Sequence, residues 1–152
     1  MVKLAFVKLL WFINIMNKVL IVDDEEAILK GIKLNLGREF SISTAKESKE
    51  ALEIVREQGP FDVVVSDMRM PGMDGATLLR TIKEENPQIM TILLTGHADF
   101  EFGGSQALQT GILFKILNKP CPPHKLSATI RAAIDEKEVT NQGEEKPPDT
   151  IL

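Results

Sequence analysis

Hydrophobic positions along the chain follow two periods in turn, and their alternation predicts five strands separated by helices. Short apolar runs are typical of strands that are buried in a sheet. Between them, apolar residues recur three and four positions apart, which is the spacing of one face of an α-helix. The strands are predicted at residues 19–22, 40–43, 63–65, 89–94 and 113–117. Helices are predicted after the first, second, third and fifth strands. Their apolar faces carry, in that order, Ile28, Leu29, Ile32 and Leu36; Ala51, Leu52 and Val55; Leu78, Leu79 and Ile82; and Leu126, Ile130, Ala133 and Ile134.

The helix after the fourth strand has the weakest pattern. It would begin near Asp99 and pack through Ala107 and Leu108. Gly103 and Gly104 lie inside it, and together they cost about 2 kcal/mol of helix propensity relative to alanine. We therefore expect this helix to be short or mobile.

Strands that alternate with helices predict a parallel sheet, because each parallel connection needs a crossover that lays a helix on one face. The predicted fold class is α/β, with a sheet between two layers of helices. In sheets of this kind, binding sites lie at the carboxyl ends of the strands. Polar residues at the predicted strand ends are therefore the candidates for chemistry.

The composition is that of one soluble domain, and it narrows the classes of partner. The 152 residues are 43% hydrophobic and 26% charged, which suits a chain with a complete core. The net charge is −4, so we expect no direct contact with nucleic acid, whose phosphates are bound by clustered lysine and arginine. Cys121 is the only cysteine. No disulfide can form within the chain, and a cytoplasmic location is expected.

The N-terminal end of the chain is unlike the rest. Residues 1–16 form a mostly apolar extension that is too short to span a bilayer and is interrupted by Lys8, so no membrane span is expected. The extension is interpreted as translation from a start upstream of Met16, or as an added helix that packs on the domain or on a second copy. A secretory leader is the less favoured alternative, because no small-residue cleavage site precedes the first strand.

The remaining chain divides into a domain and a tail. Residues 17–138 form the predicted domain. Residues 139–152 are rich in Glu, Lys, Gly and Pro, a composition that cannot bury enough apolar surface to order itself. We expect a flexible polar tail there, with no room for an output domain after it.

Chemically useful side chains stand at the carboxyl ends of four predicted strands. Because these ends meet at one edge of a parallel sheet, we expect the side chains to share one rim. Taken singly, each is better explained as an ordinary turn, strand end or helix start. Taken together, they bring three carboxylates, a hydroxyl and an ammonium to one place, which chance explains poorly. The residues are Asp23 and Asp24 after the first strand, Ser66 and Asp67 at the third, Thr95 and Gly96 at the fourth, and Asn118, Lys119 and Pro120 at the fifth.

This set of groups suits the transfer of a phosphoryl group to a carboxylate. Crowded carboxylates repel one another and need a cation. Mg²⁺ takes oxygen ligands and also neutralises charge on a phosphoryl group as it transfers. Asp67 would act as the nucleophile and form an acyl phosphate. Lys119 would pair with one phosphoryl oxygen as a point charge, Thr95 would donate a hydrogen bond to another, and Gly96 would leave space beside them.

Four sequence runs resemble the receiver domains of two-component response regulators. They are residues 19–25 (VLIVDDE), residues 63–75 (VVVSDMRMPGMDG), residues 93–98 (LLTGHA) and the pair Lys119-Pro120. The second run is the most specific, and all four occur in the family's order. The resemblance covers about residues 17–138, and the chain is similar to a stand-alone receiver.

The resemblance implies a three-layer flavodoxin-like (βα)5 fold with the parallel strand order 2-1-3-4-5. It implies that a sensor histidine kinase or a phosphotransfer protein supplies the phosphoryl group to Asp67. The chain would not be an enzyme beyond its own phosphotransfer and autodephosphorylation. By the same resemblance, Asp24 and Asp67 would bind Mg²⁺ directly, Asp23 would bind it mainly through water, and the main-chain carbonyl of Arg69 would supply another ligand. Phosphorylation would shift the domain from an inactive to an active conformation and so control a partner protein.

Two positions depart from the family's pattern. Three residues before the lysine, receivers typically carry an aromatic residue that rotates as the threonine moves, and here that residue is Ile116. Phe114 is predicted on the same face of the strand by alternation. The expected switch residues are therefore Thr95, Ile116 and Phe114, although a branched aliphatic side chain cannot swing as a ring does. The second departure is the glycine pair in the fourth helix, on the face that receivers use for dimers and targets. A homodimer stays open, and the target protein is not identified.

Two alternatives to a phosphorylation switch fit parts of the pattern. The first is a receiver-shaped interaction module whose signal no longer depends on phosphate, which Ile116 and the glycine pair favour. The second is a hydrolase of the haloacid-dehalogenase type, which normally needs a second aspartate where this chain has Arg69. A nucleotide-binding fold is not expected, because no glycine-rich loop joins a strand to a helix. The complete set of acids, with Thr95 and Lys119, favours the switch.

Overall fold

The computed structural model describes residues 3–6, 16–96 and 109–144 of the 152-residue chain. Five strands form one sheet in the order β2-β1-β3-β4-β5, and every neighbouring pair is parallel. The strands are β1 (Lys18–Val22), β2 (Ser41–Ala45), β3 (Val63–Asp67), β4 (Met90–Thr95) and β5 (Lys115–Asn118). The α/β fold and the strand order that the sequence predicted are confirmed.

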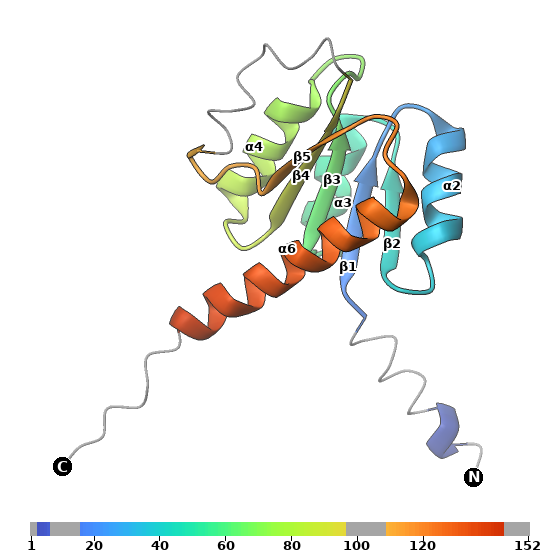
Figure 1. Cartoon of the computed structure of the whole chain (residues 1–152), viewed down its shortest axis with the longest axis vertical. Coiled ribbons are helices and arrows are strands. Elements are labelled where there is room, and N and C mark those ends of the chain that lie inside the picture. Colours follow the sequence, from blue (N-terminus) through green and yellow to red (C-terminus); the bar gives the residue numbers. More distant parts are fainter. Residues whose placement is uncertain (1–2, 7–15, 97–108, 145–152) are drawn as a thin grey trace, which may run out of the picture.

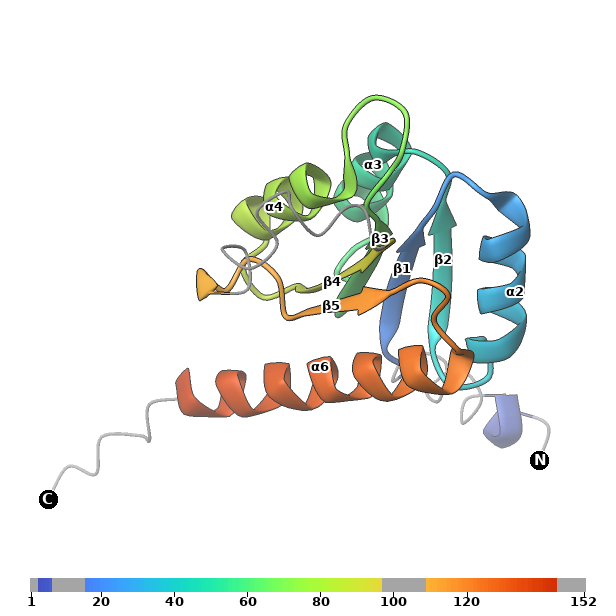
Figure 2. The same cartoon turned by 45° about the horizontal axis from the view of Figure 1, so that its top comes forward.

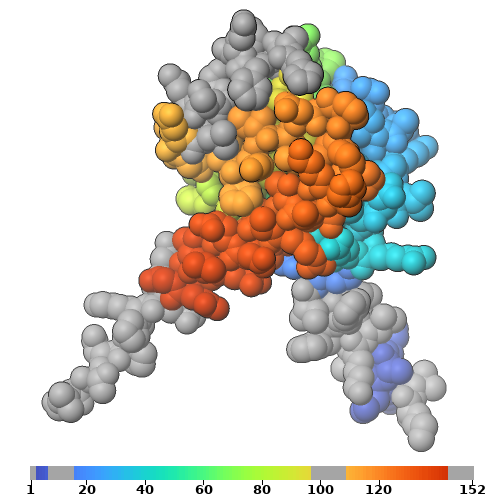
Figure 3. Space-filling model, viewed as in Figure 1, coloured from blue at the N-terminus to red at the C-terminus, as the bar shows by residue number. Residues whose placement is uncertain are grey.

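Helices cover both faces of the sheet and give the molecule three layers (Figures 1 and 2). They are α2 (Glu26–Leu36), α3 (Ser48–Gln58), α4 (Gly75–Glu85) and α6 (Pro123–Glu144). One buried cluster joins the sheet to α3 and α4, and a second joins it to α2 and α6. We call these the α3/α4 core and the α2/α6 core. In Figure 3, α6 runs across the front of the molecule, in orange to red.

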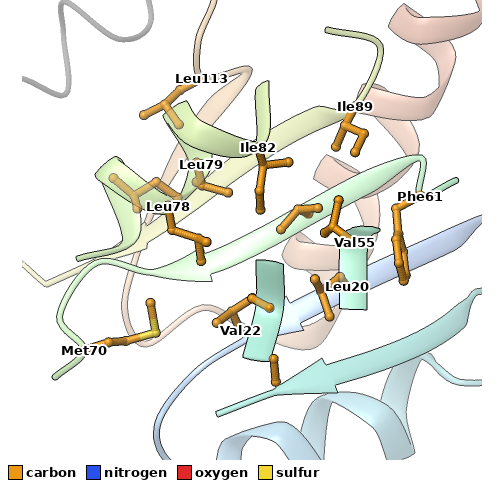
Figure 4. Close-up of a cluster of buried hydrophobic side chains, with 14 of the residues drawn as sticks. Leu20, Val22, Val55, Phe61, Met70, Leu78, Leu79, Ile82, Ile89 and Leu113 are labelled. Atoms are coloured by element: carbon orange, nitrogen blue, oxygen red, sulfur yellow. The ribbon is translucent and has the colours of Figure 1, made fainter. Parts of the chain in front are cut away.

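The apolar run of β1 fills both cores at once. Leu20 and Val22 belong to the α3/α4 core, whereas Val19 and Ile21 belong to the α2/α6 core. Successive side chains of a strand point to opposite faces, so a central strand covered on both sides needs an unbroken apolar sequence. Figure 4 shows Leu20 and Val22 in the α3/α4 core, among side chains from the covering helices such as Ile82.

The fifth strand is shorter than the sequence predicted, and this changes the placement of one aromatic residue. β5 begins at Lys115 rather than Leu113. Phe114 lies in a bend before the strand, where its N–H donates to the carbonyl of Thr91 at 2.8 Å. Ile116 packs against the α3/α4 core, but Phe114 packs against the α2/α6 core. The prediction that both share a face is wrong, because strand alternation does not extend through the bend.

Helix α6 continues beyond the domain boundary expected at residue 138 and ends at Glu144. Residues 139–144, predicted as the start of a flexible tail, are therefore helical. The hydroxyl of Thr140 donates to the carbonyl of Glu136 at 3.0 Å, so a polar sequence satisfies part of its hydrogen bonding within the helix. The polar composition excluded a buried core contribution but did not exclude an exposed helix.

Several sequence predictions concern residues outside the described part of the chain. These are residues 7–15 of the apolar extension, the fourth predicted helix between Asp99 and Leu108, and residues 145–152 of the tail. Residues 3–6 are helical, with exposed side chains. Within the described ranges, none of the helices combines the length and the apolar character that a membrane span requires.

Candidate functional site

Four strands bring polar side chains to one edge of the sheet, the edge to which the strand arrowheads point in Figure 1. Asp23 follows β1, Asp67 ends β3, Thr95 ends β4 and Lys119 follows β5. The backbone pairing continues one step beyond the strands: the N–H of Asp23 donates to the carbonyl of Ala45 at 3.1 Å, and that of Lys119 donates to the carbonyl of Thr95 at 2.9 Å. These bonds fix the backbone from which the two side chains project.

The ammonium of Lys119 links two of the carboxylates. Its Nζ donates to Oδ2 of Asp23 at 3.0 Å and lies 3.1 Å from Oδ1 of Asp67. Asp23 and Asp67 are only 1% and 7% exposed. The N–H of Glu25 donates to Oδ1 of Asp23 at 2.9 Å. Asp23 therefore has a hydrogen-bond donor on each carboxylate oxygen, and Lys119 holds it close to Asp67.

Burial and charge both shift proton affinities at this edge. Burial raises the pKa of the Asp67 carboxyl, the hydrogen bond and charge of Lys119 oppose the rise, and the charges of Asp23 and Asp24 add to it. The pKa of Lys119 is also raised: burial lowers it, but the hydrogen bonds to Asp23 and Asp67 outweigh burial. One ammonium does not compensate the clustered carboxylates, so the site favours a further positive charge.

Three consecutive acids form a cluster at the end of β1. Asp23, Asp24 and Glu25 each offer a carboxylate oxygen, and these oxygens lie within 4.8 Å of one another. Asp23 is buried, and the other two residues are exposed. The sequence predicted Asp23 and Asp24 but not Glu25, whose only signal was its position next to them. Asp67 is not a member of this cluster, and Lys119 connects it to Asp23.

Thr95 and Arg69 have different surroundings from the acids. Thr95 is buried, and its hydroxyl donates to the carbonyl of Gly96 at 3.1 Å. Arg69 is exposed and follows Asp67 by two residues, in the connection from β3 to α4. Thr95 thus ends the strand next to that of Asp67 with its hydroxyl engaged by its own backbone neighbour.

The connection from β3 to α4, residues 68–74, is named here the β3–α4 loop, and it returns to the backbone of Asp67. A Cβ atom at Gly75 would lie 1.9 Å from the carbonyl oxygen of Asp67, so only glycine fits there. The N–H of Gly75 donates to the carbonyl of Met68 at 2.8 Å. Asp74 caps α4 by accepting the N–H of Thr77 at 2.7 Å.

The sequence predictions gave Gly75 no role beside Asp67, so this contact with the site was missed. The signal that could have revealed it is a glycine at the first position of a predicted helix, where glycine has no advantage in helix propensity. Such a glycine indicates close approach of another backbone segment.

Comparison with known proteins identifies relatives across most of the chain. A family model for the response regulator receiver domain matches residues 19–131. The chain is 35% identical over 122 residues to the sensor kinase CckA of Brucella abortus, covering 79% of this chain and 13% of CckA. It is 35% identical over 128 residues to the DNA-binding transcriptional regulator NtrC of Klebsiella pneumoniae, covering 84% of this chain and 27% of NtrC. The chain spans less than a third of either relative's length.

A solved structure gives the same result for the fold. The crystal structure of a response regulator receiver domain protein from Clostridium thermocellum is similar to this chain, with a TM-score of 0.76 and 36% sequence identity. The similarity covers 82% of this chain and 99% of that one. The family match at residues 19–131 includes Asp23, Asp67, Thr95 and Lys119, and the hydrolase alternative gains no support from it.

Proposed function

The chain belongs to the response regulator receiver domain family of two-component signalling, and on that basis we propose that it is a switch in which Asp67 accepts the phosphoryl group. The observation that carries the proposal is the position of Lys119, whose ammonium lies 3.1 Å from Oδ1 of Asp67 and 3.0 Å from Oδ2 of Asp23. A buried carboxylate at a strand end, held by a cation, is arranged for nucleophilic attack on an anionic donor.

The acids around Asp67 fit a hard divalent cation such as Mg²⁺. The side-chain donors are carboxylate oxygens, which are ligands that this ion prefers. The pKa of Asp67 is raised by burial and by Asp23 and Asp24 despite the presence of Lys119. A further cation would relieve this concentration of negative charge.

We propose that Asp24, Asp67 and the main-chain carbonyl of Arg69 hold the ion directly. Asp23 would contribute through water, which is supported by the hydrogen bonds that both of its oxygens already accept. When bound, Mg²⁺ would neutralise charge on the phosphoryl oxygens.

In the proposed transfer, a carboxylate oxygen of Asp67 forms a bond to phosphorus. With a phosphohistidine donor, the phosphorus–nitrogen bond breaks, its electron pair returns to the imidazole, and the imidazole takes up a proton. Asp67 must be ionised to attack, so its raised pKa makes protonation a competing event. Lys119 would keep its charge and pair with a phosphoryl oxygen as it forms.

Thr95 would respond to the phosphoryl group from the neighbouring strand. Its hydroxyl now donates to the carbonyl of Gly96, and rotation of the side chain would exchange that acceptor for a phosphoryl oxygen. A hydrogen bond to a charged oxygen is the stronger of the two. Ile116, which packs against the α3/α4 core from the adjacent strand, is the proposed reporter of this movement. Phe114 is not proposed for this role, because it packs against the opposite core.

The proposed partners are proteins. A sensor histidine kinase or a phosphotransfer protein would supply the phosphoryl group, and a downstream target or the next member of a phosphorelay would receive the signal. The two relatives described above are named a sensor kinase and a transcriptional regulator, which supports a place in two-component signalling. The net charge of −4 supports a signal that passes through protein contact rather than through direct binding of nucleic acid by these residues. The single cysteine supports a cytoplasmic location.

The test is the intact mass of the protein after incubation with a small phosphodonor, such as acetyl phosphate, and Mg²⁺. We expect one added phosphoryl group, absent from the Asp67→Asn protein and absent when EDTA is present. If no phosphoryl group is added although Mg²⁺ binds, the proposal is wrong, and the phosphate-independent interaction module becomes the better account.

A further inference from the structure

Ser48 takes no part in the proposed reaction, yet it is buried and bonded to the loop that follows Asp67. The residue is 4% exposed, and its hydroxyl donates to the carbonyl of Met73 at 2.8 Å. We propose that Ser48 is a positioning residue, a tether that holds the β3–α4 loop in the shape that presents the main-chain carbonyl of Arg69 to the metal. The inference rests on the proposed function, because it assigns a residue to that same site.

Ser48 is the first residue of α3, one position after the N-cap, and its hydroxyl bonds outside that helix. At the N-cap itself, serine commonly accepts a backbone N–H and stabilises its own helix. Helix α3 begins at Ser48, and the preceding residue, Glu47, makes no side-chain cap. The hydroxyl of Ser48 instead donates to a residue 25 positions away. This hydrogen bond connects α3 to the β3–α4 loop, so its effect is on the loop.

The rest of the β3–α4 loop explains why a tether is needed at Met73. At its start, Met68 and Met70 are buried in the α3/α4 core. Gly72 then adopts a left-handed conformation with φ of 80°, which turns the chain. Beyond this turn, Met73 is 36% exposed, so its side chain anchors the loop weakly. The hydrogen bond from Ser48 therefore holds the part of the loop at Met73, which is not anchored by apolar contacts as Met68 and Met70 are.

Loss of the hydrogen bond from Ser48 would weaken metal binding by giving the β3–α4 loop more conformational freedom. A carbonyl ligand that is held in place binds a cation without first being ordered, and a loosened one must be ordered on binding. The carbonyl of Met73 would turn to water, and the loop would sample more conformations. Asp67 and Lys119 are held by strand ends and by each other, so their placement would change little.

The experiment compares three substitutions in the full chain. Ser48→Ala removes the hydroxyl, and Ser48→Thr keeps one at the same position. Thr81→Ala is the matched control, because the hydroxyl of Thr81 also donates to a backbone carbonyl, that of Thr77 at 2.9 Å, but within α4. Mg²⁺ affinity is measured from amide resonance shifts, and amide hydrogen exchange of residues 72–75 is measured without metal. Neither measurement needs a phosphodonor.

We expect Ser48→Ala to weaken Mg²⁺ binding roughly three- to tenfold, the range set by the loss of one hydrogen bond, and to speed exchange in residues 72–75. Ser48→Thr and Thr81→Ala should stay within about twofold of the starting protein on the same scale. The inference is overturned if Ser48→Ala matches Thr81→Ala in both measurements, or if Ser48→Thr is as impaired as Ser48→Ala. Failure of the unsubstituted protein to accept a phosphoryl group would instead count against the proposed function alone.

Discussion

The Asp67 carboxylate, which is proposed to attack phosphorus, lies in surroundings that raise its pKa. Burial raises the pKa of Asp67, and the charges of Asp23 and Asp24 raise it further, while Lys119 opposes them. An ionised carboxylate in such a place costs folding free energy, and any cation that enters the site recovers part of it. The electrostatics at this one residue therefore connect the stability of the domain with its proposed metal binding and reactivity.

Asp67→Asn should increase the free energy of unfolding at neutral pH, by about 0.5–2 kcal/mol, as substitutions that relieve functional strain do. The folded-state pKa of Asp67 is raised above its usual value of 3.8. At pH values between 3.8 and the folded-state pKa, the folded state binds more protons than the unfolded state. The contribution of Asp67 to the free energy of unfolding is therefore fully present below pH 3.8 and is lost as the pH rises through the folded-state pKa. Urea unfolding at several pH values, without metal, measures the difference.

The pH dependence separates this cause from a general effect of removing charge. The gain should shrink in acid, where Asp67 is protonated and resembles asparagine. Asp135→Asn, on the exposed face of α6, is the control and should change stability by less than about 0.5 kcal/mol at any pH. A gain for Asp67→Asn that persists unchanged in acid, or no gain at neutral pH, would contradict the electrostatic account.

At the scale of elements, the start of α4 lies close to the end of β3. The first residue of the helix lies so near the carbonyl of Asp67 that a Cβ has no room, and Asp74 caps the same turn. The start of α4 is therefore fixed against the residue that is proposed to react. A change at this contact should affect the strand end and the helix together.

Gly75→Ala should lower the free energy of unfolding by about 1–3 kcal/mol. The new Cβ would lie 1.9 Å from the carbonyl oxygen of Asp67, so the backbone must move. Gly31→Ala, inside α2, is the matched control, since a Cβ there would have no other segment of the structure within 4 Å. It should stabilise by about 0.5–1 kcal/mol through helix propensity. Urea unfolding of both proteins measures the two effects. Equal changes in the same direction would refute the assigned contact.

Sequence patterns predicted the elements well where burial dictated the residue type. The buried strands β1 and β3 need apolar residues on both faces, and their sequences leave few other interpretations. The start of β5 was harder, because Leu113 and Phe114 are as apolar as the strand itself and nothing in the run marks the bend. The end of α6 was missed because an exposed polar helix and a polar loop have similar composition.

Across the whole molecule, the site exists only because distant segments fold to one edge of the sheet. Asp23 and Lys119 are 96 positions apart and share a hydrogen bond. The acids and Lys119 could be predicted because strand order and direction bring strand ends together. A glycine at the start of a helix could have indicated that another backbone segment lies close to Gly75, but not which one. Ser48 could not be predicted, because a sequence pattern does not record which carbonyl the folded chain places near its hydroxyl.

A phosphoryl group at Asp67 should change the conformation of residues away from the site, because the strands that end beside it contribute side chains to both cores. It adds about −1.5 to −2 charges beside Lys119 and Thr95, and a conformation that pairs these groups with the new oxygens becomes more populated. With beryllofluoride as a phosphoryl mimic and Mg²⁺, we expect amide resonance shifts that reach Ile116 and the rest of β5, and none in the Asp67→Asn protein. Ile116 is half-buried against the α3/α4 core, so its resonance reports a change in that packing. Shifts confined to residues beside Asp67 would mean that the domain binds the phosphoryl mimic without changing conformation.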